Sequence, residues 1–387
     1  MHISSRIQSV PASGIRKFFD VVSQMEGVIS LGVGEPDFVT PRIIRDACIN
    51  ALEKGYTTYT SNYGLAELRR LVSDHIHQDN GVTYDPASQV LITVGASEAI
   101  DVAMHAILEV GDEVIIPEPC FVSYKPCVIF AGGVPVPIAT SAENEFVADP
   151  ADIEAAVTPR TRAIFISYPS NPTGTVMPKE KMQAVVDIAR KHDLYIISDE
   201  IYDKLVYGVK HVCVPAMDGA YERTIYINGF SKAYAMTGWR IGYVCTNPEL
   251  LEAMMKVHQY IIMCAPIMAQ MAAMAALRNG KHDMESMVRE YDHRRRLIVD
   301  SLNRIGLDCF EPKGAFYVFP SIKRTGLTSD EFAERLLFEE NVAVVPGNAF
   351  GACGEGYVRC SYATSIENIQ EAMSRTAAFV NRIAASR

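Results

Sequence analysis

The chain has 387 residues, 49% hydrophobic and 21% charged, a composition that excludes a disordered or collagen-like protein. At about 150 residues per domain, this length predicts roughly two to three domains. A net charge of −10 argues against nucleic acid and anionic membranes as partners, and nine cysteines without a Cys-x-x-Cys pair indicate reduced thiols rather than a disulfide framework or a zinc site.

Targeting signals are the next feature to exclude. The N-terminus lacks the apolar core of a signal peptide, so we expect a cytoplasmic protein. Residues 260–277 reach the length of a membrane span, but Pro266 and Gln270 interrupt them. We therefore predict a buried or interface helix there, no membrane segment and no metal site.

The first elements form an N-terminal arm and a helix. A turn-rich stretch at residues 32–40, with Pro36 and Pro41, separates the arm from a predicted helix over residues 43–54. The first domain boundary is therefore predicted near residue 45.

The central part of the chain alternates short apolar runs with amphipathic stretches. Met182, Val185, Val186 and Ala189 recur at helical spacing and predict a helix that lies on a sheet. The alternation is typical of βαβ units, so we predict an α/β fold with a mainly parallel sheet and helices on both faces. The predicted strands are residues 90–94, 113–116, 163–167, 194–198, 224–228 and 241–244.

After about residue 280 the pattern changes to a smaller α+β unit. A long charged helix passes through Tyr291 and Leu302, and short strands follow at residues 315–319, 342–345 and 357–361. The basic run 294–296 on this helix predicts a solvated or ion-paired face. The predicted domains are therefore residues 45–280, and residues 1–44 together with 281–387.

Ligands of parallel sheets bind beyond the carboxyl ends of the strands, so the residues after each predicted strand matter most. Gly95, Ala96 and Ser97 follow the first strand and precede a helix, which suits a phosphate. The alternative is that Ser97 simply caps the helix. The glycine fingerprint of dinucleotide sites and the Walker sequence are both missing, which favours a ligand of mononucleotide size.

Three later loops add an aromatic ring, an amide and a carboxylate. Phe121 could stack on a planar ligand, although an aromatic residue of this kind, taken alone, is more often a core residue. Asn171 lies in a proline-rich turn that offers a donor and an acceptor, or that is only a loop. Asp199 directly follows a buried strand, with Tyr202 three residues later, and a structural salt bridge is its alternative role.

The fifth strand leads to Lys232, with Arg240 eight positions later. Alone, this lysine could be an ordinary solvated side chain. Beside a phosphate site, a stacking ring and a buried acid, it becomes a candidate Schiff-base nucleophile. This set suits pyridoxal phosphate, because Asp199 would keep the pyridine nitrogen protonated and Asn171 and Tyr202 could donate to the phenolic oxygen.

The residues also resemble a known family. The stretch 231–242, SKAYAMTGWRIG, is similar to the signature around the Schiff-base lysine of the class I aminotransferases, which are fold-type I pyridoxal phosphate enzymes related to aspartate and aromatic aminotransferases. Residues 34–38, 170–174, 199–202 and 357–363 match in the same order, so the resemblance covers essentially the whole chain. It implies a seven-stranded sheet and a pyridoxal-phosphate-dependent transaminase.

The resemblance also implies a role for each site residue. Lys232, Asp199 and Tyr202 are the implied catalytic residues. Tyr59 matches a tyrosine that reaches the cofactor phosphate of the other subunit, which implies a homodimer with shared sites. The implied cofactor-binding residues are Tyr59, Gly95, Ala96, Ser97, Phe121, Asn171, Asp199, Tyr202, Ser231, Lys232 and Arg240, and the implied substrate-binding residues are Gly34, Phe121, Asn171 and Arg359, the last as a clamp for the α-carboxylate.

Two positions depart from many members of the family. Phe121 stands where many relatives have tryptophan, which weakens inferences that depend on an indole. Gly229 stands where some relatives have a phosphate-binding serine, which leaves Ser231 as the nearby hydroxyl. Neither change removes the Schiff-base lysine.

The expected reaction moves an amino group from an α-amino acid to 2-oxoglutarate by a ping-pong mechanism. Aromatic donors are preferred, because no second arginine is assignable to an acidic side chain and Phe18, Phe19, Tyr63 and residues 260–266 could line an apolar pocket. Aspartate or another amino acid as donor, and a C–S β-lyase reaction on the same cofactor, are the alternatives. A ligand-sensing regulator is disfavoured, because no DNA-binding extension precedes residue 45.

Overall fold

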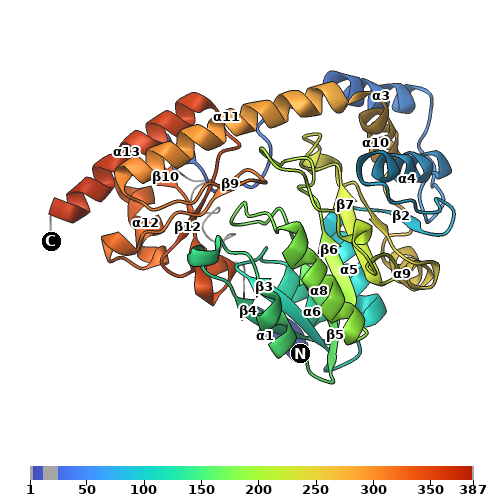
Figure 1. The fold of residues 1–387 in the computed structure, drawn as a ribbon. Helices are drawn as coiled ribbons and strands as arrows, with labels where there is room; N and C mark the ends of the chain where they lie inside the picture. The colour runs from blue at the N-terminus through green and yellow to red at the C-terminus, as the bar shows by residue number, and fades with distance from the viewer. Residues whose placement is uncertain (1–2, 12–24, 386–387) are drawn as a thin grey trace.

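The computed structural model describes residues 3–11 and 25–385, so Phe18 and Phe19 lie outside the described part of the chain. A seven-stranded sheet with helices on both faces dominates the fold (Figure 1). Its strand order is β2-β8-β7-β6-β5-β3-β4, and only β8 runs antiparallel to its neighbours. The predicted α/β class is confirmed. The strands are β2 (Val90–Thr93), β3 (Glu113–Glu118), β4 (Val134–Ala139), β5 (Thr161–Ile166), β6 (Tyr195–Asp199), β7 (Thr224–Gly229) and β8 (Gly242–Cys245).

Each of the six strands predicted in this region is present, but the sequence analysis missed β4. Pro135 and Pro137 conceal it, because proline cannot donate a backbone hydrogen bond to a central strand. Among the described residues, β4 pairs only with β3, in the parallel register Val114 to Pro135. An edge strand tolerates proline because one side of it has no partner strand.

The apolar strand runs are continuous because both faces of the sheet are covered. Val114 and Ile116 pack with residues of α5 and α9, whereas Ile115 and Ile164 pack with residues of α8 on the opposite face. This alternation follows from successive side chains pointing to opposite faces of a strand. The helices around the sheet are α5 (Ala96–Ile107), α6 (Tyr124–Phe130), α7 (Pro150–Ala155), α8 (Lys179–Lys191) and α9 (Pro248–Ile261).

The apolar run at 260–277 divides into the end of α9 and the helix α10 (Ile267–Asn279), with Pro266 between them. α10 packs against α3 (Arg42–Glu53) and α4 (Ala66–Asn80). Its buried Gln270 accepts the backbone N–H of Leu65 at 2.7 Å. Within residues 3–11 and 25–385, no helix has both the length and the apolar character that a bilayer crossing requires.

The rest of the chain builds two small sheets and long helices at the other end of the molecule (Figure 1). The predicted strand at 342–345 is two short strands interrupted at Val344, and that at 315–319 shortens to two residues. The proposed domain boundaries at 45 and 280 stay a prediction. The elements at this end are β1 (Ile29–Ser30), α11 (Lys281–Ile305), β9 (Tyr317–Val318), α12 (Ser329–Glu340), β10 (Val342–Ala343), β11 (Val345–Pro346), β12 (Val358–Ser361) and α13 (Ile366–Ala385). The short helix α1 (Ser5–Ser9) instead lies beside α6, where Arg6 donates to the backbone oxygen of Phe130 at 3.2 Å (Figure 1).

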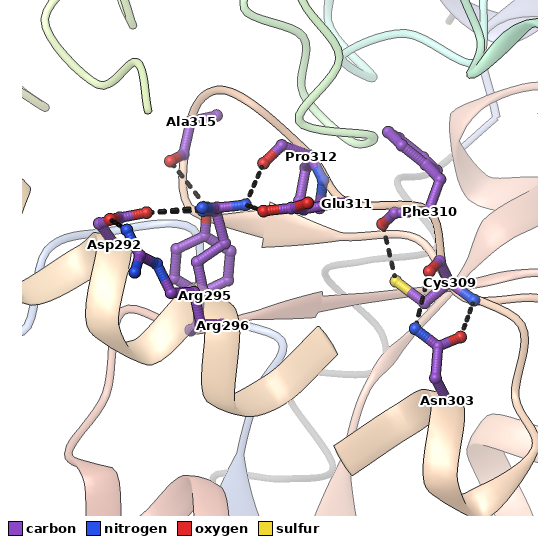
Figure 2. Close-up of polar contacts among 10 residues, drawn as sticks. Asp292, Arg295, Arg296, Asn303, Cys309, Phe310, Glu311, Pro312 and Ala315 are labelled. Carbon is purple, nitrogen blue, oxygen red and sulfur yellow. Dashed lines mark hydrogen bonds and ion pairs between the residues drawn. The ribbon is translucent and has the colours of Figure 1, made fainter. Parts of the chain in front are cut away.

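The basic run on α11 is ion-paired, as one of the two predicted alternatives states. Arg294 is buried and donates to Asp37 at 2.8 Å, which ties α11 to the N-terminal segment. Arg295 is also buried and donates to Asp292 and Glu311, as Figure 2 shows. Arg296 is both exposed and ion-paired, because its side chain is 70% exposed and its Nη2 donates to Oδ2 of Asp292.

Candidate functional site

A cavity of about 330 Å³ lies at the carboxyl ends of the central strands. The structure brings every predicted site residue into its lining except Tyr59 and Gly95. Further residues that the sequence analysis did not single out also line it. The lining comprises Gly34, Ala96, Ser97, Ile100, Phe121, Val122, Tyr124, Asn171, Asp199, Ile201, Tyr202, Ser231, Lys232, Thr237, Arg240, Tyr317 and Arg359.

Lys232 lies in the turn after β7 and points its amine into this cavity. Its Nζ donates to the backbone oxygen of Gly34 at 2.9 Å. Burial lowers the pKa of Lys232 to about 8, and the neighbouring positive charges of Arg359 and Arg240 act in the same direction. A larger fraction of the amine is therefore unprotonated near neutral pH, which is the form that attacks a carbonyl carbon.

Asp199 ends β6 and is 5% exposed. The hydroxyl of Tyr124 donates to its Oδ2 at 2.7 Å, and the N–H of Ile201 donates to its Oδ1 at 3.2 Å. Burial raises the pKa of Asp199 to about 6, although both hydrogen bonds favour the charged form. Since both partners are uncharged, they do not support the alternative of a structural salt bridge.

Tyr124 is a side-chain partner of Asp199 that the sequence did not predict. It begins α6, three residues after Phe121, and its hydroxyl oxygen also lies 2.9 Å from the hydroxyl of Ser167, which can donate to it because the one phenol proton is given to Asp199. The rings of Phe121 and Tyr124 meet edge to face with centroids 5.5 Å apart. The sequence offers only a weak signal for this role of Tyr124, because a tyrosine in a helical pattern is usually a core residue.

The phosphate-sized part of the cavity is formed where α5 begins. Gly95 is its N-cap with φ +80°, so the alternative that Ser97 caps the helix is wrong. A Cβ at position 95 would lie 2.7 Å from Nη2 of Arg240, so the guanidinium rests on this glycine. A guanidinium beside the N–H groups of a helix N-terminus suits an anion.

The structure explains why glycine stands at 229. A Cβ there would lie 3.0 Å from the Cα of Gly242 and 3.1 Å from the backbone oxygen of Ile241. A serine at this position would therefore require the backbone of residues 241–242 to move by a few tenths of an ångström. Ser231 is the hydroxyl of this turn that lines the cavity.

Arg359 lies on β12 and is 4% exposed, so the alternative of a surface arginine is wrong. Its Nη1 donates to Oδ1 of Asn171 at 2.9 Å and its Nη2 to the backbone oxygen of Gly32 at 2.6 Å. Its Nε has no hydrogen-bond partner in the described part of the chain. A buried guanidinium whose partners include no carboxylate is prepared to bind an anion.

Two aromatic residues complete this side of the cavity. The hydroxyls of Tyr202 and Tyr317 lie 2.9 Å apart, and burial raises the pKa of both. The guanidinium carbon of Arg359 lies 4.5 Å from the ring centroid of Tyr317. A Cβ on Gly34 would lie 2.6 Å from the Tyr317 hydroxyl, so glycine permits this close packing.

Other predicted residues lie away from the cavity. Tyr59 is 81% exposed. Tyr63 donates its hydroxyl to Glu252 at 2.5 Å, and neither it nor residues 260–266 line the cavity of this chain. Among the described residues, no group of three or more His, Cys, Asp or Glu side chains could hold a metal ion.

The fold and the arrangement of the cavity define a pyridoxal-phosphate-dependent transferase. Comparison with known proteins identifies the family, because the pattern of "Aminotransferase class I and II" matches residues 26–375. The chain belongs to this family and is a pyridoxal-phosphate-dependent aminotransferase.

Individual relatives agree over the whole length. The chain is 48% identical to "Aromatic-amino-acid aminotransferase 2" of Thermococcus litoralis and 47% identical to an aspartate aminotransferase of Pyrococcus abyssi, covering 97% of each chain in both comparisons. The solved aromatic aminotransferase of Pyrococcus horikoshii OT3 superposes with a TM-score of 0.91 at 44% identity, covering 94% of this chain and 99% of that one.

The residues present fit the cofactor. Pyridoxal phosphate requires an amine for its aldehyde, a carboxylate for its ring nitrogen and N–H donors for its phosphate. Lys232, Asp199 and the start of α5 with Arg240 supply these groups around one cavity. Arg359, whose partners include no carboxylate, remains for a substrate.

Proposed function

We propose that the protein transfers the amino group of an α-amino acid, with aromatic donors preferred, to 2-oxoglutarate by a ping-pong mechanism. One observation carries this proposal. The buried amine of Lys232, with its pKa lowered to about 8, shares a cavity with Arg359, a buried guanidinium whose partners include no carboxylate. A nucleophilic amine and an anion-binding fork in one cavity suit the two ends of an α-amino acid.

Each residue of the cavity has a proposed contact. Asp199 holds the protonated ring nitrogen, Asn171 and Tyr202 donate to the phenolic oxygen, and Phe121 stacks on the ring. Gly95, Ala96, Ser97, Ser231 and Arg240 bind the phosphate. The cofactor supplies an aldehyde that binds amines covalently and a ring that withdraws electrons from the substrate Cα.

Lys232 has two tasks in this proposal. It would hold the aldehyde of the cofactor between turnovers, and its amine, once free, would take up the proton that leaves the substrate Cα and give it back later in the reaction. Arg359 orients the donor through its carboxylate, with Gly34 and Asn171 beside it. In a ping-pong reaction the donor would leave as a keto acid before the 2-oxo acid acceptor binds, and Arg359 would orient the acceptor in the same way.

The lining supports an apolar donor. Ile100, Phe121 and Val122 form an apolar part of the wall. The cations of the described lining are Lys232, Arg240 and Arg359, and each already has a proposed partner. The names of the relatives include both aromatic and aspartate aminotransferases, so the donor has to be measured.

An amino-donor panel with 2-oxoglutarate as acceptor tests the substrate. We expect phenylalanine and tyrosine to give a higher kcat/KM than aspartate, with one glutamate formed per keto acid. A higher value for aspartate would overturn the aromatic preference. Pyruvate, ammonia and thiol from a cystine-like substrate, without glutamate, would indicate the lyase alternative.

We also propose a homodimer in which Tyr59 reaches the partner's cofactor phosphate. Tyr59, Tyr260 and Ile261 are 81%, 87% and 58% exposed, an unusual exposure for such apolar side chains. The two segments are adjacent, because the side-chain amide of Asn62 donates to the side-chain oxygen of Gln259 at 3.5 Å. A second copy of the chain would cover this apolar face.

Mixing two inactive variants tests the shared site. A heterodimer of Lys232→Ala and Tyr59→Ala subunits contains one site with both native residues. We expect the mixture to exceed the activity of the Tyr59→Ala protein alone, and light scattering to give a dimer. A monomer at micromolar concentration, or a mixture with no gain, would contradict the shared site.

A further inference from the structure

Tyr317 lies between the two functional ends of the cavity and has no role in the function proposed above. It is 1% exposed and begins β9. Its hydroxyl lies 2.9 Å from that of Tyr202, and its ring faces the guanidinium of Arg359 at 4.5 Å. Tyr317 therefore contacts a proposed cofactor ligand and the proposed carboxylate clamp at the same time.

The direction of the tyrosine hydrogen bond follows from counting protons. Each phenol hydroxyl carries one proton. If Tyr202 donates its proton to the phenolic oxygen of the cofactor, the bond at 2.9 Å requires Tyr317 to donate to Tyr202. A hydroxyl that accepts a hydrogen bond is itself a stronger donor, because hydrogen bonds in a chain polarise one another.

The guanidinium strengthens this chain. A positive charge over the ring face stabilises electron density on the phenol oxygen and makes its proton easier to donate. In agreement with this, Arg359 lowers the pKa of Tyr317, although burial has the larger, opposite effect. A carboxylate bound to Arg359 would offset this charge and weaken the donation.

Neighbouring segments hold Tyr317 in place. Arg295 of α11 donates to Glu311 and to the backbone oxygen of Pro312, at 2.6 and 3.1 Å, and Figure 2 shows both contacts. The N–H of Ala315 donates to the backbone oxygen of Leu205 at 2.9 Å. These bonds tie residues 311–317 to α11 and to the loop that carries Tyr202.

The pairing of β9 with β12 holds the backbone of Tyr317 in place. β9 pairs with β12, the strand of Arg359, in the register Tyr317 to Ser361. The Gly34 backbone leaves no room beside the hydroxyl, since a Cβ there would approach it to 2.6 Å. The ring of Tyr317 cannot move independently of the two groups that it contacts.

We propose that Tyr317 is a positioning residue that couples the carboxylate clamp Arg359 to the cofactor ligand Tyr202. Binding of a substrate carboxylate thereby changes the hydrogen bond that reaches the phenolic oxygen of the cofactor. This inference rests on the roles of Arg359 and Tyr202 in the proposed function, but not on the identity of the amino donor.

Absorbance of the cofactor-loaded protein, titrated with pH, measures the coupling without turnover. Tyr317→Phe keeps the ring and removes the proton donor. Weaker hydrogen-bond donation to the anionic phenolic oxygen of the cofactor makes the protons near that oxygen harder to remove. We therefore expect the pH midpoint of the absorbance change to rise in Tyr317→Phe, by less than it rises in Tyr202→Phe. The donor KM should change less than about twofold, because the ring under Arg359 remains.

Two further variants separate coupling from a purely structural role. Tyr317→Leu also removes the ring and should raise the donor KM about tenfold. Tyr362→Phe is the matched control, because its hydroxyl donates to the backbone oxygen of Ala315 at 3.1 Å and does not line the cavity. A midpoint unchanged in Tyr317→Phe, or shifted equally in Tyr362→Phe, would overturn the proposal.

A carboxylate without an amino group tests the link to Arg359. Saturating 3-phenylpropanoate should shift the midpoint of the native protein more than that of Tyr317→Phe, and equal shifts would overturn the coupling. If only succinate shifts the native midpoint, the aromatic preference fails and the same comparison is made with succinate. When Tyr202 is already replaced by Phe, Tyr317→Phe should not raise the pH midpoint any further, because the coupling acts through the Tyr202 hydroxyl.

Discussion

The cavity has two halves that the chain builds in different ways. The cofactor half contains Lys232, Asp199 and the start of α5, which lie at the end of β7, β6 and β2 of one sheet or within a few residues after it. The carboxylate half contains Gly34 and Arg359, which come from segments far apart in the sequence and meet through β1, β10 and β12.

The two halves also use burial differently. In the cofactor half, burial moves the pKa of Lys232 down to about 8 and that of Asp199 up to about 6, so both groups approach their neutral forms. In the carboxylate half, Arg359 keeps a fixed positive charge between two aromatic rings. The first half is prepared for proton transfer and the second for recognition, so substitutions should separate chemistry from substrate binding.

The largest separation is expected for Lys232→Ala. This variant removes the Schiff-base amine and the proton carrier but leaves Arg359 unchanged. Multiple-turnover amino transfer should fall at least roughly a thousandfold, as for the loss of a general acid–base and nucleophilic group. Binding of 3-phenylpropanoate, followed by calorimetry, should persist. Turnover near the native rate would contradict the role of Lys232.

Asp199→Asn tests the cost of the buried carboxylate. Because burial raises the pKa of Asp199 from 3.8 to about 6, the folded protein holds a proton between these pH values that the unfolded chain has lost. The stability of the cofactor-free protein therefore rises as pH falls through this window, and at pH 7 the ionised carboxylate costs about 3 kcal/mol.

The variant should thus raise the melting temperature of the cofactor-free protein at pH 7 and flatten its pH dependence between 4 and 6. Cofactor affinity should fall, because asparagine cannot hold the ring nitrogen protonated. Thermal melts and cofactor titration measure both effects. A cofactor-free variant less stable than the native protein at pH 7 would contradict the energetic role of burial.

Arg359→Lys tests the carboxylate half. Lysine keeps the charge but loses the planar fork, so we expect kcat/KM to fall by about 2 kcal/mol, which is roughly thirtyfold. The cofactor affinity of the variant should remain near native. An unchanged kcat/KM would reject the clamp, and an equal loss of cofactor affinity would show that the two halves are not separable.

The smallest effect is expected for Gly34→Ala. Its Cβ would approach the Tyr317 hydroxyl to 2.6 Å, so the ring has to shift. Overpacking of this kind costs about 1 kcal/mol, and the donor KM should rise roughly fivefold. Steady-state kinetics with a saturating acceptor check this value. If kcat/KM fell as much in Gly34→Ala as in Arg359→Lys, Gly34 would have a role beyond leaving room for the Tyr317 hydroxyl.

Sequence reasoning reached the cofactor half because chemistry there follows strand ends. Asp199 and Lys232 could be assigned from the apolar runs that precede them, and Gly95 from the turn before a helix. Tyr124 could not, since its hydroxyl reaches Asp199 across 75 positions of sequence. The strand β4 was concealed by prolines that only an edge position tolerates.

Local sequence determined the α/β fold, the order of its strands along the chain and the residue types at each strand end, because periodicity and turn chemistry act between near neighbours. Only the tertiary structure decided that Arg359 is buried with no carboxylate partner and that Tyr317 joins it to Tyr202. Burial and contact depend on segments that the chain brings together across hundreds of residues, and these set the pKa values and the pairing of charges on which the chemistry rests.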